Sequence, residues 1–526
     1  MAWTRSRYSF AEPAWDAAPR PLLHSLLRPV DELLAGGGDA RLALSSPSRE
    51  NSYGCTPFPR PTLIDFASST ASSISIQAYE RVKEAQSELV ARCLLDGAEA
   101  ASQAVVASAR QSLLAILKLQ ASGTEVIFSP SGTDAQLHVL FLGKSLLRRP
   151  LTVVVAGSDQ TGSGTAQTCK GRHFSQITAR GWEVEKGGII AGLGEGVESL
   201  EISFCKPDGE FRSLQEIDDA TLDAVRAATS RDRSVLLQAM DASKFGWRAP
   251  SDACLDAIAE QWPGRVLIVM DACQMRLSRE RLGALLAKGY CVLVTGSKFF
   301  TGPAFSGALL IPATVSREML TIRRPPKAFA GYASGCDWPE QWATLRSYLP
   351  AELNLGQWLR WEAALEEMRL YYAVPKSFRD GLTNRFGQAV ESLIGTSFHL
   401  GLLPKGPEQV ATISAVTLRD DKGFLPPHAV AKIYRALRRD LSDLNPPPGG
   451  TGLASRPCQL GQPVALPGMN SAALRISLSA RAIRACWSGV VGDTDRRVAQ
   501  LLTDLWVAVG KLDYLARHSE TLGGIE

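Results

Sequence analysis

Short apolar segments separated by helical segments constrain the fold of this chain more than any other feature. Apolar runs recur at residues 125–128, 151–156, 234–239, 265–270, 290–294 and 308–311. Segments with helical periodicity, such as 251–261 and 279–288, lie between several of them. Buried strands joined by helices are typical of a mostly parallel sheet with both faces covered. We therefore predict an α/β domain over residues 76–330, which begins with a helical segment at 76–120.

The composition and periodicity of the sequence differ on either side of this domain. Residues 1–75 are rich in Gly, Ser and Pro and show no regular periodicity, so we predict a partly irregular N-terminal arm. After residue 330, helical patterns and strand patterns follow one another, which favours a smaller α+β domain at 331–526. The expected helices are 355–372, 377–395, 427–444 and 493–517, and the expected strands are 410–418 and 473–478.

Composition excludes several classes of protein. The 526 residues are 45% apolar and 21% charged, as in ordinary globular proteins, and 57 basic against 53 acidic residues give no reason to expect nucleic acid. The ten cysteines contain no CxxC pair, so we predict no metal site and reduced thiols. Residues 1–16 lack a secretory signal, and no apolar run could span a bilayer. We predict a cytoplasmic protein without a membrane partner.

The segment Ser131-Gly132-Thr133-Asp134 follows one expected strand and opens a helix. Backbone N–H groups at a helix N-terminus, together with a Thr hydroxyl, form a natural binding site for phosphate. The same residues could simply cap the helix.

Two further residues follow successive strands of the expected sheet. Asp271 ends the run 265–270, and Lys298 comes shortly after the run 290–294. Ligands of parallel sheets bind outside the carboxyl ends of the strands, where a carboxylate could pair with a protonated ring nitrogen. A desolvated Lys gives up its proton more easily, as a Schiff-base amine must. The alternatives are a helix-capping Asp271 and an exposed Lys298 whose stem packs on neighbouring phenylalanines.

Arg475 alternates with apolar residues in the expected strand 473–478. Its guanidinium could bind a substrate carboxylate through two parallel hydrogen bonds, or it could form a structural ion pair. A Schiff-base Lys, an acid on the pyridine nitrogen and a phosphate site are what pyridoxal 5′-phosphate (PLP) chemistry requires.

At these residues the chain resembles the fold-type-I PLP-dependent enzymes, specifically the class V aminotransferase and cysteine-desulfurase-like group. The resemblance covers about residues 76–480 and is most specific at 271–274, at 295–298 with Gly302-Pro303, and at 131–134. It implies the PLP-dependent transferase fold, with a mostly parallel seven-stranded sheet in a large domain and a smaller α+β domain. It also implies that PLP is the cofactor.

The resemblance assigns roles to individual residues. Lys298 matches the Schiff-base Lys that also shuttles the substrate proton, Asp271 the acid that keeps the pyridine nitrogen protonated, and Gln274 the residue that hydrogen-bonds the phenolic oxygen. Arg475 matches the Arg that binds the substrate carboxylate. The matches to the phosphate-binding residues are Gly132, Thr133, Thr295 and Ser297.

The sequence departs from the family near the cofactor ring. Many relatives carry a His that stacks on the ring, after the strand equivalent to 151–156. Here Gln160 or Thr161 would take that place, and His138 and His173 are the nearest histidines.

A second departure concerns the stretch where relatives carry Ser-Asn near the ring, because Ser243 and Lys244 stand there. Lys244 is thus a rival candidate for the cofactor Lys, although its flanking residues do not match. Residues 187–210 add length to the domain, and we interpret them as an extra hairpin or loop.

Several reactions fit this pattern. An aminotransferase-like enzyme acting on an amino acid is the leading interpretation, and a PLP-dependent lyase is the alternative. The lyase class includes a β-lyase, a decarboxylase, a carbon–carbon bond-forming enzyme and a cysteine desulfurase that uses Cys458 on a loop before Arg475. Cys458 could equally be a small buried apolar residue. A non-catalytic regulator with this fold is a further alternative.

The family also implies a homodimer with shared active sites, in which residues 331–335 are candidates for reaching the partner. Relatives cover the substrate pocket with N-terminal segments. Asn51 and Tyr53 are therefore candidate substrate-binding residues, unless the arm only wraps around the surface.

Overall fold

The structure is a computed structural model that describes residues 22–406, 408–442 and 451–519. The expectation about a secretory signal concerns residues 1–16, which lie outside the described ranges. So do the first 21 residues of the predicted arm.

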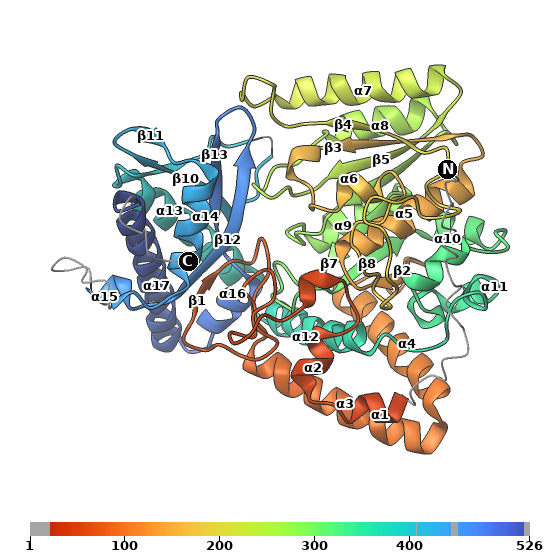
Figure 1. The fold of residues 1–526 in the computed structure, drawn as a ribbon, viewed down its shortest axis with the longest axis horizontal. Helices are drawn as coiled ribbons and strands as arrows, with labels where there is room; N and C mark the ends of the chain where they lie inside the picture. Colours follow the sequence, from red (N-terminus) through yellow and green to blue (C-terminus); the bar gives the residue numbers. More distant parts are fainter. Residues whose placement is uncertain (1–21, 407, 443–450, 520–526) are drawn as a thin grey trace, which may run out of the picture.

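A seven-stranded sheet forms the centre of the large domain (Figure 1). One strand, β8 (Gly307–Ile311), runs antiparallel to both of its neighbours, whereas all other neighbouring strands pair in parallel. The predicted fold class, a mostly parallel seven-stranded sheet with a smaller α+β domain, is confirmed. The strand order is β2 (Glu125–Ser129), β8 (Gly307–Ile311), β7 (Cys291–Thr295), β6 (Val266–Asp271), β5 (Ser234–Met240), β3 (Leu151–Ala156) and β4 (Glu198–Ile202).

Helices cover both faces of this sheet, because each central strand carries apolar side chains on both sides. In β7, Val292 and Val294 pack into one apolar core, and Cys291 and Leu293 pack into another. This alternation is the period of two expected for a strand buried on both faces. The helices around the sheet are α5 (Gly132–Leu146), α7 (Leu214–Ser230), α8 (Asp252–Gln261), α9 (Arg279–Ala287) and α10 (Ala313–Met319).

Three long helices lie below the sheet in Figure 1. The predicted helical segment 76–120 is two helices, α3 (Ile76–Asp96) and α4 (Ala98–Leu117), because Gly97 adopts φ 84° between them. Glycine takes this left-handed conformation without steric cost. α12 (Leu355–Tyr372) has the predicted bounds and packs against both.

The smaller domain contains a second sheet with helices packed against it. The strands are β1 (Ile64–Phe66), β12 (Cys458–Leu466), β13 (Ser471–Ser477), β10 (Ile413–Asp420) and β11 (Gly423–Phe424) in this order, and β9 (Leu400–Leu402) also pairs with β10. The helices are α13 (Lys376–Gly395), α14 (Pro427–Leu437), α15 (Thr451–Ala454), α16 (Ala480–Cys486) and α17 (Val491–Arg517).

The N-terminal arm is more ordered than its sequence indicated. It forms α1 (Leu22–Leu26), α2 (Val30–Ala35), the 3-10 turn η1 (Ala40–Leu42) and β1, which pairs in parallel with β12. Buried Arg360 of α12 donates hydrogen bonds to the carbonyls of Leu34, Gly36 and Gly37. The arm is therefore anchored to both domains.

The interpretation of residues 187–210 as an extra hairpin or loop is only partly correct, because residues 198–202 form the edge strand β4 between stretches of loop and turn. Its sequence, Glu-Ser-Leu-Glu-Ile, is only partly buried and lacks an apolar run. Residues 331–335, the candidates for reaching a partner, are buried within this chain. The remaining short elements are η2 (Ser158–Gln160), α6 (Thr165–Thr168), η3 (Lys327–Gly331), η4 (Gly335–Asp337), η5 (Glu340–Trp342) and α11 (Ala343–Arg346).

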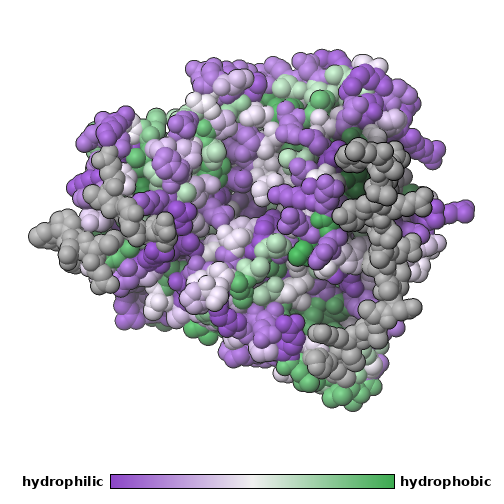
Figure 2. Space-filling view, in the orientation of Figure 1, coloured by the Kyte–Doolittle hydropathy of each residue, from purple (hydrophilic) through white to green (hydrophobic). Residues whose placement is uncertain are grey.

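The surface in Figure 2 is mostly hydrophilic, with an apolar patch over the corner where α3 meets α4. Leu94 and Leu95 at this corner are 71% and 83% exposed. Within the described residues, no helix combines the length and apolar character needed to cross a membrane.

We expect Leu293→Ala to destabilise the large domain. Leu293 is fully buried in β7, and removing a buried Leu side chain costs about 3 kcal/mol in transfer and cavity energy. Urea unfolding followed by tryptophan fluorescence should show an earlier transition. Leu27→Ala is the control, because that side chain is 77% exposed; an equal shift in both variants would contradict the packing described here.

Candidate active site

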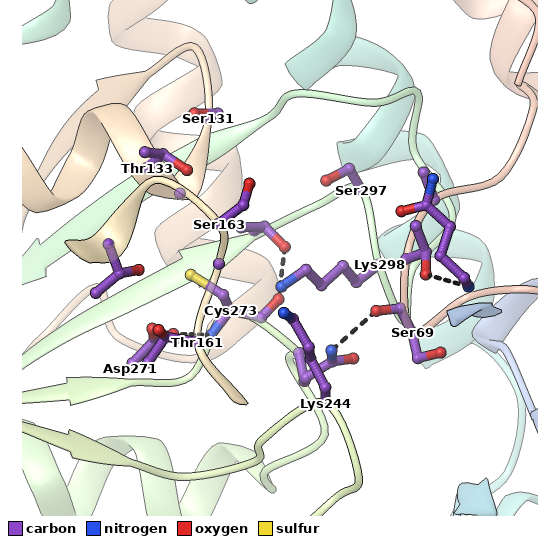
Figure 3. A pocket seen from close by; sticks show the side chains of 18 of the residues that line it. Ser69, Ser131, Thr133, Thr161, Ser163, Lys244, Asp271, Cys273, Ser297 and Lys298 are labelled. Atoms are coloured by element: carbon purple, nitrogen blue, oxygen red, sulfur yellow. Dashed lines mark hydrogen bonds between the residues drawn. The ribbon is translucent and has the colours of Figure 1, made fainter. Parts of the chain in front are cut away.

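A cavity of about 340 Å³ lies where the large domain, the small domain and the N-terminal arm meet. Figure 3 shows part of its lining. The predicted residues that line it are Tyr53, Gly132, Thr133, Gln160, Thr161, Lys244, Asp271, Gln274, Thr295, Ser297, Lys298 and Arg475. The predicted residues Asn51, Ser243 and Cys458 do not line it.

The floor of the cavity is the carboxyl edge of β6 and β7. Because these strands pair in parallel with Asp271 opposite Leu293, Asp271 and Thr295 reach the same edge of the sheet. One Asp271 carboxylate oxygen accepts a hydrogen bond from the Cys273 N–H at 3.1 Å, and the Thr295 hydroxyl donates to the Cys273 carbonyl at 2.6 Å. These bonds fix the Asp271 carboxylate at the cavity wall (Figure 3).

The loop that carries Lys298 packs closely against α12. A Cβ on Gly296 or Gly302 would lie 2.4 Å or 2.7 Å from the Ala364 side chain, so only glycine fits at either position. Thr301 adopts a left-handed conformation with φ 56°, which a residue with a side chain rarely takes. The loop therefore holds a fixed shape, and the Lys298 side chain extends into the cavity (Figure 3).

The N-terminus of α5 provides an anion site on a second wall. The Ser131 hydroxyl accepts a hydrogen bond from the Asp134 N–H and caps the helix. Other N–H groups of a first helical turn have no acceptor within the helix and attract anions. A Cβ on Gly132 would lie 2.8 Å from the Cys273 sulfur, so the backbone is open here only because residue 132 is glycine.

Arg41 from η1 lies beside this helix end, and the sequence analysis missed it. It forms an ion pair with Asp39 at 2.6 Å and approaches the hydroxyls of Ser131 and Thr133 at 3.4 Å. Its guanidinium lies over the Phe305 ring, 4.5 Å from the centroid. A single Arg in an irregular segment gives no sequence signal, because only the tertiary fold brings the arm to α5.

Gln160, one of the two residues expected in place of the stacking His, lines the cavity. Its Oε1 accepts hydrogen bonds from the Ser243 hydroxyl at 2.5 Å and the Phe245 N–H at 3.3 Å, whereas its buried Nε2 has no partner among the described residues. Ser243 was expected to bind the cofactor, but its side chain is engaged with Gln160 and with the Trp247 N–H at 3.1 Å. It supports Gln160 from outside the cavity.

Neither candidate histidine lines the cavity. His138 is buried in α5 against Phe329 and Trp338, and burial lowers its pKa to about 4. His173 stacks on Tyr332 and hydrogen-bonds its hydroxyl at 2.5 Å. Both histidines therefore pack within the large domain.

Arg475 reaches the cavity from β13. It is buried, and burial lowers its pKa to about 10. It donates hydrogen bonds to the carbonyls of Ser69 and Gln462 and to the Thr70 hydroxyl, at 2.8–3.2 Å. Its Nε has no partner, and no carboxylate pairs with it within the described ranges, so the structural ion pair considered above is absent there.

The arm segment around Ser69 joins Arg475 to the large domain. The Gln274 amide donates to the Ser69 carbonyl at 3.0 Å, and the Arg475 guanidinium donates to the same oxygen at 3.2 Å. The amide nitrogen of Gln274, which the family resemblance assigned to the cofactor's phenolic oxygen, is thus occupied by the arm. Gln274 nevertheless lines the cavity.

Lys244 is a second Lys in the cavity. Burial, together with the nearby positive charges of Arg475 and Lys298, lowers its pKa to about 8. In Figure 3 the ends of the Lys244 and Lys298 side chains come together in the middle of the cavity. Lys244 is therefore easier to deprotonate than an exposed Lys.

Asn51 does not reach the cavity. Its side-chain oxygen accepts hydrogen bonds from the N–H groups of Tyr53 and Cys55, so it shapes the loop that presents Tyr53. The Tyr53 hydroxyl lies 3.4 Å from the Arg41 guanidinium, and Tyr53 lines the cavity.

The expectation that Cys458 lies on a loop is wrong. Cys458 begins β12, where it pairs with Ile64, and its side chain is fully buried. Burial raises the pKa of its thiol to about 11. The side chain is therefore an uncharged thiol away from the cavity, as the alternative interpretation had it.

The chemistry of the cavity fits the cofactor that the sequence implied. The first turn of α5 and the hydroxyls of Thr133 and Ser297 suit a phosphate, and the Asp271 carboxylate suits a protonated ring nitrogen. The cavity of about 340 Å³ leaves room for a bound group, and the unpaired Nε2 of Gln160 leaves it a hydrogen-bond donor. The Lys298 amine extends into the same space.

The mostly parallel seven-stranded sheet and the separate α+β domain match the architecture that the family resemblance implied. No protein-family profile and no curated protein matches the chain. One similar solved structure is a C-DES variant with glycine covalently linked to the PLP cofactor. It is 13% identical in sequence, and the match covers 84% of this chain and 97% of that chain with a TM-score of 0.49. A phosphoserine aminotransferase from Cytophaga hutchinsonii is 14% identical, and the match covers 85% of this chain and 99% of that chain with a TM-score of 0.49. The cysteine desulfurase CsdA from Escherichia coli is 12% identical, and the match covers 84% of this chain and 95% of that chain, also with a TM-score of 0.49.

We expect Gly132→Ala to weaken anion binding at α5, because the added methyl would meet the Cys273 sulfur at 2.8 Å and displace the first turn. The dissociation constant for inorganic phosphate, followed by phosphorus NMR line width, should rise about tenfold, as for the loss of one charge-assisted hydrogen bond. Gly283→Ala is the matched control, because nothing lies within 4 Å of its Cβ position in α9. Unchanged phosphate binding in Gly132→Ala would argue against an anion site here.

Proposed function

We propose that this chain is a PLP-dependent enzyme that acts on an amino acid by an aminotransferase-like reaction, with Lys298 as the point of covalent attachment. The observation that carries the proposal is the meeting of Lys298, Asp271 and the N-terminus of α5 in one cavity. These groups come from three separate elements, and their chemistry matches the aldehyde, the ring nitrogen and the phosphate of PLP.

When bound, PLP supplies an aldehyde that condenses with amines and a protonated pyridine ring that withdraws electrons from the bonds at the substrate Cα. The Asp271 carboxylate would hold the proton on the ring nitrogen, and Thr133 and Ser297 would hold the phosphate. Gln160 would donate a hydrogen bond through its unpaired Nε2. Arg475 would bind the substrate α-carboxylate and thereby orient Cα toward the Lys298 amine, which moves the Cα proton.

Two observations favour the aminotransferase-like reaction over a cysteine desulfurase. Cys458 is buried in β12, away from the cavity. Among the described residues that line the cavity, Cys273 is the one cysteine, and burial together with Asp271 raises its pKa well above the usual range. A persulfide-forming thiolate therefore has no candidate there. A decarboxylase, a β-lyase or a carbon–carbon bond-forming enzyme stays the alternative.

A homodimer with shared active sites and a cytoplasmic location stay part of the proposal. The exposed leucines at the α3–α4 corner support an interface with another protein surface, since apolar side chains gather at such contacts (Figure 2).

Lys298→Ala should abolish covalent attachment of PLP. After borohydride reduction, intact-protein mass spectrometry should show the cofactor mass on the unaltered chain and on Lys244→Ala, but not on Lys298→Ala. The yellow absorbance of the loaded protein should follow the same pattern. Retained attachment in Lys298→Ala, with loss in Lys244→Ala, would transfer the role to Lys244 and overturn the assignment.

The reaction can be identified by adding single amino acids to the PLP-loaded enzyme without a keto-acid acceptor. We expect one donor, added in large excess, to bleach the yellow absorbance and leave pyridoxamine phosphate in stoichiometric amount, because only the small amount of keto acid formed could reverse the half-transamination. Cys458→Ser should behave identically, since its thiol is buried outside the cavity. Release of carbon dioxide, sulfide or a cleaved product with the absorbance retained would instead establish a lyase.

A further inference from the structure

The cavity contains more positive charge than the proposed cofactor chemistry uses. Of the residues that line it, Arg41, Lys244, Lys298 and Arg475 are cationic, whereas Asp271 is the only acid among the described ones. Arg41 is already neutralised by Asp39 at 2.6 Å. Buried charges are costly unless paired, so the remaining cations need a negative partner from the ligand.

The bound cofactor would use one of the three remaining cations. Lys298 would be attached to it covalently, Asp271 would pair with the ring nitrogen, and the phosphate would bind at the N-terminus of α5 beside Arg41. Lys244 and Arg475 are then left without an anion. One α-carboxylate satisfies only one of them.

Lys244 is half-buried, and it differs from other buried or half-buried cations of the chain. Buried Lys511 donates to the carbonyls of Arg439 and Arg456 at 2.7 Å, and half-buried Arg281 pairs with Asp241 and Asp252. Lys244 has neither a hydrogen-bond nor an ion-pair partner in the described part of the chain.

The charged groups facing Lys244 are Arg475, Lys298 and Asp159. Asp159 is the weakest of these influences, and one of its oxygens accepts a hydrogen bond from the Phe204 N–H at 2.8 Å. The two stronger influences are repulsive. A negative group placed between Lys244 and Arg475 would relieve that repulsion.

We propose that the substrate is an amino acid with a second acidic group on its side chain, and that Arg475 binds the α-carboxylate while Lys244 binds the side-chain acid. This inference rests on the proposed function and names its substrate class. The two cations belong to different domains, Arg475 to β13 and Lys244 to the turn after β5, so a dianion would also join the domains across the cavity.

Non-reacting dicarboxylates test the proposal, because they lack the amine that reacts with the cofactor. Isothermal titration of the full-length, PLP-loaded protein should give a dissociation constant for succinate or glutarate about tenfold below that for butyrate, as expected for one added buried ion pair. The dicarboxylate of best length reports the spacing of the two cations. Equal affinity for mono- and dicarboxylates would overturn the proposal.

Variants of Lys244 locate the second acid. In Lys244→Met, the dissociation constants for succinate and glutarate should come to within about twofold of that for butyrate, and the constant for butyrate should not change. Lys244→Arg should keep most of the preference for dicarboxylates. Lys376→Met, at an exposed Lys, is the control. An equal loss of mono- and dicarboxylate binding in Lys244→Met would show that Lys244 does not select the side-chain acid.

The pH dependence of the unaltered protein keeps the test independent of how the variants fold. Burial and the neighbouring cations place the pKa of Lys244 at about 8. At a pH lower than this, where Lys244 is charged, succinate should bind more tightly than butyrate. As the pH rises above this value, the difference between the two dissociation constants should disappear. A pH-independent advantage would count against Lys244.

The same samples separate this inference from the proposed function. Absence of reducible PLP from both Lys298 and Lys244 would refute the enzyme assignment, whatever the result with the carboxylates. PLP on Lys298 together with no preference for dicarboxylates would refute only the substrate class. Among true substrates, aspartate, glutamate, cysteine sulfinate and phosphoserine then distinguish the carboxylate, sulfinate and phosphate forms of the side-chain acid.

Discussion

The parallel pairing of β6 with β7 is the constraint on which the whole site depends. Parallel strands end at the same edge of a sheet, so residues distant along the chain meet there. Asp271 and the loop of Lys298 are joined to this edge by the Cys273 N–H and the Thr295 hydroxyl. Packing of Gly296 and Gly302 against α12 then fixes the loop from the other side. The reacting amine is thus positioned by sheet register and helix packing together.

The three parts of the molecule contribute different chemistry to the cavity. The large domain supplies the groups suited to the cofactor, which are Lys298, Asp271 and the end of α5. The small domain supplies Arg475, and the arm supplies Arg41 and the Ser69 carbonyl that holds Arg475. Because Arg360 ties the arm to α12, and β1 ties it to β12, a shift of the arm would move Arg41 and the Ser69 carbonyl that holds Arg475.

The sequence revealed the groups that local pattern determines. Asp271 and Lys298 follow apolar strands, and Gly132 opens a helix, so their positions follow from periodicity and the rules of parallel sheets. The pattern could not reveal Arg41, which lies in an irregular segment and reaches α5 only through the tertiary fold. It also placed Cys458 on a loop, because the Gly- and Pro-containing sequence of β12 lacks the regular alternation of a strand. β4 was missed since an edge strand need not be apolar.

Local sequence indicates the groups suited to the cofactor, but it does not indicate the balance of charge that selects the substrate. Local sequence could predict the residues suited to the cofactor. Each of them is one residue type at the end of one strand or the start of one helix, where it would bind the phosphate, pair with the ring nitrogen or provide the amine. Substrate selection instead depends on the balance of buried charges from separate elements, such as Lys244 and Arg475, which no local pattern records. Arg475 lowers the pKa of Lys244, and two cations in one cavity are stable only if something else offsets their repulsion. Within the described residues no second acid at the cavity does so, and the offset must come from the bound ligands.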